Sequence, residues 1–140
     1  MKNDNMQKKK LSSKKDPEKN IKPAVSDWIF MSIDEITTSD LYIFLKPLKL
    51  GELDFWEEMN ILSLEMPDRT CIDMEGLKEG FSDGKDRQFM IENGYKTVFF
   101  VSLSCYNDSA KAVFEKILEH FPGGFFADTE DFKPNLISKK

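Results

Sequence analysis

The fold is decided by residues 97–127, which read TVFFVSLSCYNDSAKAVFEKILEHFPGGFFA. Residues 97–104 are rich in β-branched and aromatic side chains, which predicts a strand. Residues 108–121 carry apolar side chains at the three- and four-residue spacing of an amphipathic helix. Residues 124–127 are short and apolar, which predicts another strand. The stretch therefore predicts a strand, a helix and a strand.

Both ends of the predicted helix are marked, the start by capping residues and the end by residues that stop helices. Asn107, Asp108 or Ser109 can accept a hydrogen bond from a free backbone N–H of the first turn. Pro122-Gly123-Gly124 ends the helix because proline cannot continue the hydrogen-bond ladder and glycine tolerates a positive φ. A helix of this length suits a right-handed crossover between parallel strands. We therefore expect the two flanking strands to be parallel neighbours.

The composition divides the chain into a basic start and an acidic remainder. The 140 residues are 40% hydrophobic, which fits one domain. Residues 1–24 hold eight lysines, three acids and no aromatic residue, for a charge of 8 − 3 = +5. Residues 25–140 hold 12 basic and 22 acidic residues, for a charge of 12 − 22 = −10. We predict a disordered basic tail over residues 1–24, a single domain over residues 25–135, and a short basic C-terminal tail over residues 136–140.

The first half of the chain gives weaker signals. Residues 28–33 predict a strand, and residues 41–45 favour a second strand paired antiparallel with it, although Asp40 could instead cap a short helix. Residues 51–64 fit a helix, or a shorter helix followed by an extended segment from residue 61.

Residues 73–81 and 86–92 predict two short helices separated by Ser82-Asp83-Gly84, with Asn93-Gly94 as a stop. Together with the preceding elements they predict an α+β fold with one sheet of about four or five strands and helices mainly on one face. A ferredoxin-like or related split βαβ arrangement fits this order.

The sequence carries no recognisable catalytic or metal-binding motif. Cys71 and Cys105 are the only cysteines and form no CxxC pattern, so we expect reduced thiols, with Cys105 packed as a small apolar residue. His120, the only histidine, lies in the last helical turn without a visible catalytic partner. We predict a noncatalytic protein with no catalytic residue, metal site or cofactor.

Acidic residues next to large apolar residues are the best candidates for a binding site. One group lies in the middle of the chain, and the other follows the strand at residues 124–127, where α/β folds often place ligands. Anchors surrounded by charge suit a protein interface. The predicted partner-binding residues are Trp56, Glu57, Glu58, Asp128, Glu130 and Asp131. The alternative is a small metal- or ligand-binding enzyme that combines the Asp128, Glu130 and Asp131 cluster with His120.

Residues 97–132 resemble the small cytoplasmic immunity proteins of bacterial contact-dependent and polymorphic toxin systems. The resemblance lies in the strand at 97–104, the helix at 108–121 and the following FPGGFFADTEDF segment. Those proteins share no diagnostic motif, so the resemblance assigns no functional residue. It implies a tight inhibitor of a toxin, often a basic nuclease, for which an acidic surface is suitable.

The charge distribution also suggests which partners the chain avoids. The acidic body should repel nucleic acid and favour a basic protein, whereas the lysine-rich tail could contact phosphates, anionic lipid or the body itself. No apolar run reaches the length of a membrane span and no signal sequence is evident, so we expect a cytoplasmic protein. The sequence leaves the oligomeric state open.

Overall fold

The computed structural model describes residues 26–78, 80–82 and 84–138. The predicted basic tail of residues 1–24 and the final two lysines lie outside the described residues.

The described chain forms one antiparallel sheet and three α-helices, which confirms the α+β class. The sheet has seven strands in the order β2-β3-β4-β5-β1-β6-β7, so the prediction of four or five strands is wrong. The strands are β1 (Asp27–Ser32), β2 (Glu52–Trp56), β3 (Ile61–Glu65), β4 (Cys71–Leu77), β5 (Thr97–Leu103), β6 (Gly124–Ala127) and β7 (Asn135–Ile137). The helices are α1 (Thr38–Leu45), α2 (Gly84–Glu92) and α3 (Asp108–His120), with short 3-10 turns η1 (Lys46–Leu48) and η2 (Glu57–Met59).

Three of the additional strands come from segments for which the sequence favoured helices, and the fourth, β7, comes from the region next to the predicted C-terminal tail. Residues 51–64 form β2, η2 and β3, so only the extended part from residue 61 was predicted correctly. Most of residues 73–81 belongs to β4 rather than to a helix. The sequences ELDFW, ILSLE and CIDME alternate apolar and polar side chains, which is the period of a strand with one face buried. β7 includes residues 136–137, which the sequence had assigned to the C-terminal tail.

Residues 41–45 show the opposite error, because they belong to α1 and not to a strand. Thr37 and Asp40 form a reciprocal capping box: the Asp40 amide donates to Thr37 Oγ1 at 3.0 Å, and the Thr37 amide donates to Asp40 Oδ2 at 2.9 Å. This cap satisfies two backbone donors at the helix start. It outweighs the β propensity of the aromatic and branched residues that follow.

The unit of β5, α3 and β6 forms as predicted, and Asn107 caps the start of α3 by accepting from the Ala110 amide at 2.9 Å. The two strands are parallel to one another because both pair antiparallel with β1. They are not neighbours, however, since β1 lies between them. The residues of β1 after Asp27 are mostly apolar, and all of them are buried. This composition allows the strand to lie in the centre of the sheet.

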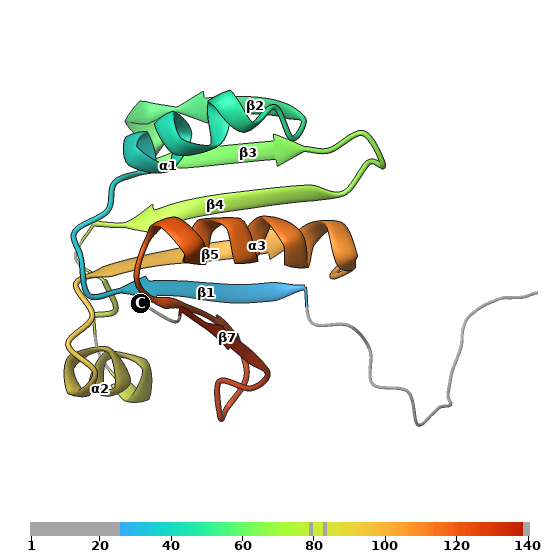
Figure 1. The fold of residues 1–140 in the computed structure, drawn as a ribbon. Helices are drawn as coiled ribbons and strands as arrows, with labels where there is room; N and C mark the ends of the chain where they lie inside the picture. The colour runs from blue at the N-terminus through green and yellow to red at the C-terminus, as the bar shows by residue number, and fades with distance from the viewer. Residues whose placement is uncertain (1–25, 79, 83, 139–140) are drawn as a thin grey trace, which may run out of the picture.

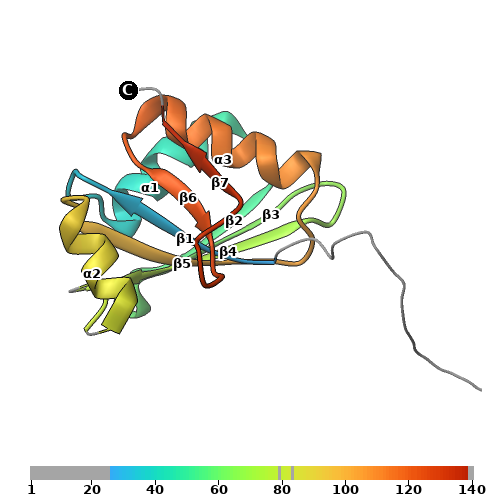
Figure 2. The ribbon, with the colours of Figure 1, turned by 90° about the horizontal axis from the view of Figure 1, so that it is seen from below.

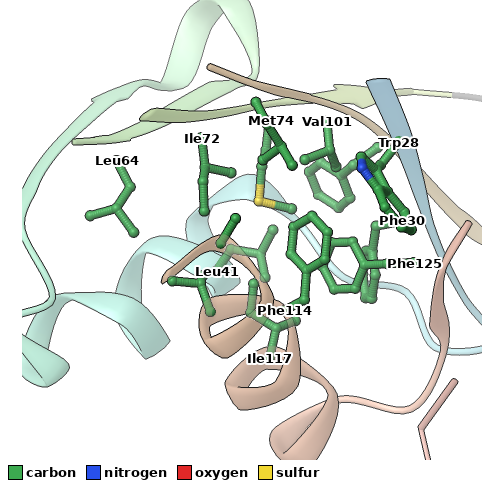
Figure 3. Packing of buried hydrophobic residues seen from close by; sticks show 14 of the residues in the cluster. Trp28, Phe30, Leu41, Leu64, Ile72, Met74, Val101, Phe114, Ile117 and Phe125 are labelled. Carbon is green, nitrogen blue, oxygen red and sulfur yellow. The ribbon is translucent and has the colours of Figure 1, made fainter. Parts of the chain in front are cut away.

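The helices lie on both sides of the sheet, with two on one side and one on the other. Figure 2 shows α1 and α3 above the sheet and α2 below it, toward one end of the strands. In Figure 1, α3 runs along the strands in front of β5, between β4 and β1, and α1 covers β2 and β3. The main core fills the space between the sheet and these two helices (Figure 3). Its fully buried aromatic residues are Trp28, Phe30, Phe99, Phe114 and Phe125.

A smaller core lies on the other side of the sheet, under α2. It contains Met90 from α2 and the outward side chains of the central strands, such as Ile29, Val98 and Phe126. The stacked rings of Phe89 and Phe132, with centroids 4.4 Å apart, extend it toward the β6–β7 connection. This cluster includes no residue of β2 or β3, so it leaves part of the second side of the sheet uncovered.

Candidate functional site

We call the uncovered part of the second side the open face. It consists of outward side chains of β2, β3, β4 and β5, together with Asp27 at the start of β1. Its large apolar residues are Trp56, Ile61 and Phe100. Its acidic residues, all exposed, are Asp27, Glu52, Asp54, Glu65, Asp73 and Glu75.

Strand register brings the aspartates of the open face into one row across the sheet. Asp54 of β2 lies opposite Ser63 of β3, which lies opposite Asp73 of β4. Asp73 in turn lies opposite Ser102 of β5, which lies opposite Asp27 of β1. The serines separate the like charges, so that adjacent carboxylates in the row are about 10 Å apart at ordinary strand spacing. The Ser63 hydroxyl donates to Asp73 Oδ1.

A second row, next to the first, carries the apolar residues. Trp56 lies opposite Ile61, which lies opposite Glu75, and Glu75 lies opposite Phe100. Trp56 is 49% exposed and Phe100 is 40% exposed, values far above those of the core aromatic residues. Between the two rows is a hollow of about 340 Å3, lined by residues of both. An apolar stripe bordered by carboxylates is thus open to solvent.

Negative charge continues beyond the open face to β6. The Asp128 amide donates to the Asp27 carbonyl at 2.9 Å, which places Asp128 beside the end of the aspartate row. Partial burial is the main cause that raises the pKa of Asp128 above its ordinary value. The nearby carboxylates of Asp86 and Asp27 raise this pKa further. Among the described strand residues that point to the open face, none is basic.

The predicted binding residues fall into three places. Trp56 lies on the open face, as described above. Glu57 and Glu58 of η2 line a different hollow of about 650 Å3, near the start of α1, which also contains Lys78 and Lys96 and is therefore mixed in charge. Asn60, after η2, donates from Nδ2 to the Gly76 carbonyl of β4 at 2.9 Å and so links two sides of this hollow.

Glu130 and Asp131 are exposed in the connection between β6 and β7. Asp131 Oδ1 accepts from Thr129 Oγ1 at 3.1 Å and from the Lys133 amide at 3.2 Å. These hydrogen bonds lower the pKa of Asp131 below its ordinary value, and the bond from Thr129 has the largest effect. The carboxylate therefore closes a local turn. Of the C-terminal acidic group, only Asp128 adjoins the open face.

His120 lies in the last turn of α3, and its ring stacks on Phe44 with centroids 4.5 Å apart. His120 precedes β6 and Asp128 follows it, so the imidazole and the acidic group lie at opposite ends of a four-residue strand. Within the part of the chain that the structure describes, no three His, Cys, Asp or Glu residues are grouped so as to hold a metal ion.

The two cysteines are free. The prediction that Cys105 is packed is wrong: it is exposed, because β5 ends at Leu103 and the alternation of that strand does not continue to residue 105. Cys71, at the start of β4, is half-buried.

Most residues of the open face were missed because their strands had been interpreted as helices. A usable signal was present: Glu52 and Asp54, and likewise Asp73 and Glu75, are two residues apart and alternate with apolar side chains. That period places both acids of each strand on the side opposite the core. The alignment of the strands with one another was not visible in the sequence.

The geometry defines the class as an α+β protein with an antiparallel sheet, one side of which is partly uncovered and acidic. No protein-family model, no curated protein and no solved structure gave a match to the chain. None of the helices in the described ranges is long and apolar enough to cross a membrane.

Proposed function

We propose that this chain is a noncatalytic protein-binding domain whose open face binds a basic surface on a partner protein. The observation that carries the proposal is the open face itself, with six exposed carboxylates, two exposed aromatic rings and no basic side chain from the described strands. Aromatic residues often provide the largest share of binding energy in interfaces. Carboxylates around them favour a positively charged partner and speed association at low salt.

The partner class follows from the sequence resemblance to bacterial immunity proteins. We propose a cytoplasmic immunity protein, whose partner is a toxin domain with a basic surface, such as a nuclease. Binding would neutralise the toxin by covering the residues that contact its anionic substrate. A catalytic role has less support, because His120 and the C-terminal acidic group lie at opposite ends of β6.

The test compares charge reversal on the open face with the same change elsewhere. The site variant is Asp54→Lys with Glu75→Lys, two exposed residues of the open face. The matched control is Glu115→Lys with Glu119→Lys, two exposed residues of α3 on the opposite side of the sheet. Both variants change the net charge equally, so a difference between them reports the position of the charge.

The full chain and both variants are used to capture partners from the native host, with circular dichroism as a check of folding. We expect the same basic protein with wild type and control, its loss with the site variant, and weaker capture as salt rises. Trp56→Ala should also weaken binding at least about tenfold, as expected for a central aromatic anchor. Equal capture by all variants would refute the role of the open face.

We also propose that the central part of the fold is a ferredoxin-like arrangement. Support comes from the strand order β4-β5-β1-β6 and from the two long connections, one through α1 between β1 and β4 and one through α3 between β5 and β6. In this interpretation the β2–β3 hairpin is an insertion after α1. This insertion widens the sheet and provides two of the four strands that form most of the open face.

A further inference from the structure

The first strand of the described chain, β1, begins next to the open face. Asp27 is both the first residue of β1 and the last member of the aspartate row. The 24 N-terminal residues, which lie outside the described part of the chain, carry eight lysines and three acids. We infer that this N-terminal segment docks on the open face of its own chain. The inference deepens the proposed function, since it assigns a regulator to the same surface.

The length of the segment is sufficient for this contact. Asp54, at the far end of the row, is four strands from Asp27, which corresponds to about 19 Å at ordinary strand spacing. Lys14 precedes Asp27 by thirteen residues, and an extended chain of that length spans at most about 45 Å. Lys14, Lys15 and every lysine before them can therefore reach any carboxylate of the open face.

The chemistry of the segment matches that of the surface. Residues 1–24 carry a charge of 8 − 3 = +5, and the open face carries six carboxylates. Lysine side chains can also lay their methylene stems on apolar surface and place the ammonium over an aromatic ring. The half-exposed ring of Trp56, two residues after Asp54 at the end of β2, offers such a position.

Other occupants fit this surface less well. A second copy would bring another six carboxylates against the first, and nucleic acid would bring phosphates, so both meet like-charge repulsion. A segment tethered to the same chain has an effective concentration in the millimolar range, which allows weak ionic contacts to be populated. A basic partner must then displace the segment, which raises its apparent dissociation constant. Docking would thus protect the face from weak basic competitors.

The experiment uses the full chain without a partner. Ser12→Cys carries a nitroxide spin label, and Cys71→Ser with Cys105→Ser removes the native thiols. In nuclear magnetic resonance spectra at low salt, we expect broadening of the amides of β2, β3 and β4 and of the Trp56 indole, but not of the exposed side of α3. At about 1 M salt, where the Debye length is about 3 Å, the broadening should be lost.

Two variants test the origin of the contact. Asp54→Lys with Glu75→Lys should abolish the broadening because it replaces two carboxylates of the open face by positive charges. Lysine-to-glutamine changes at residues 8, 9, 10, 14 and 15 should also abolish the broadening, because they remove five positive charges from the N-terminal segment. These changes alter no described residue. Glutamine at Lys111 and Lys116 of α3 is the control and should change nothing. Absence of broadening at low salt, or broadening that survives either the open-face variant or the lysine-to-glutamine variant, would overturn the inference.

A mixed sample separates contacts within a chain from contacts between chains. Isotope-labelled chain without the spin label is combined with unlabelled chain that carries it. Docking within the chain predicts no broadening in this sample, and broadening there would overturn the assignment. Because no partner is present, failure here leaves the proposed function intact, whereas failure of partner capture leaves the docking result unchanged.

Discussion

The contact between Phe114 of α3 and Phe125 of β6 is the closest of the aromatic contacts in the core. The two rings are stacked with centroids 3.9 Å apart and an interplanar angle of 6°, and both are fully buried. Phe114 also meets the edge of Trp28 at 5.5 Å (Figure 3). The pair joins the longest helix to the sheet, so its loss should affect global stability rather than a local segment.

Removing the ring gives a magnitude that can be measured. Phe114→Ala should lower the free energy of unfolding by about 3–5 kcal/mol, because a buried phenylalanine leaves a cavity that closes only in part. A domain of this size has about 5–15 kcal/mol in total. Since this variant could unfold outright, Phe114→Leu, Phe125→Leu and the double variant provide a second measurement, with an expected coupling of about 0.5–1.5 kcal/mol.

The assay is urea unfolding followed by far-ultraviolet circular dichroism, because Trp28 fluorescence would respond directly to the change at Phe114. Phe100→Leu is the matched control, since Phe100 is 40% exposed on the open face, and it should change stability by less than about 0.5 kcal/mol. Strictly additive effects of the two core variants, or a control that costs as much as Phe114→Leu, would refute the assignment of these rings.

Three further predictions concern the helix cap, Asp128 and the thiols. Thr37→Ala removes the capping box and should lower stability by about 1 kcal/mol in urea unfolding; no change would mean that α1 does not depend on its cap. The pKa of Asp128 is raised in the folded state, so the folded protein loses stability as pH rises through that pKa. Asp128→Asn should therefore be more stable than wild type near neutral pH, by less than about 1 kcal/mol at this partly exposed site, and the difference should vanish at acid pH; a variant that is less stable near neutral pH contradicts this. Cys105 is exposed and Cys71 half-buried, so iodoacetamide should modify Cys105 faster, as read by mass spectrometry of the single serine variants; equal rates would contradict the difference in exposure.

Elements with a strong local signal were predictable from the sequence. The helix at Asp108–His120 has a wide apolar stripe, an asparagine cap and a proline-glycine stop, and all three signals agree. The strands on either side of it were predicted from their β-branched, aromatic and apolar side chains. In contrast, residues 41–45 combined strand-forming side chains with a helix cap, and only the cap geometry resolved the conflict.

The candidate site was much less accessible from the sequence. Trp56 was chosen for its acidic neighbours, but those neighbours, Glu57 and Glu58 of η2, line a separate hollow near the start of α1. The aspartate row depends on Asp54, Asp73 and other residues that are distant in sequence, and which lie together only because five strands align in register. Pairing between strands is a non-local property, and no single segment encodes it.

Composition and side-chain spacing act within a few residues, so the acidic body, the basic start and the local elements with consistent periodicity could be predicted without the fold. The tertiary structure alone decided that β1 separates β5 from β6, that α2 covers only part of the second side of the sheet, and that the carboxylates of the open face form a row. Those features depend on which strands and helices bury their apolar side chains against one another. The segments that do so are up to about a hundred residues apart in the sequence.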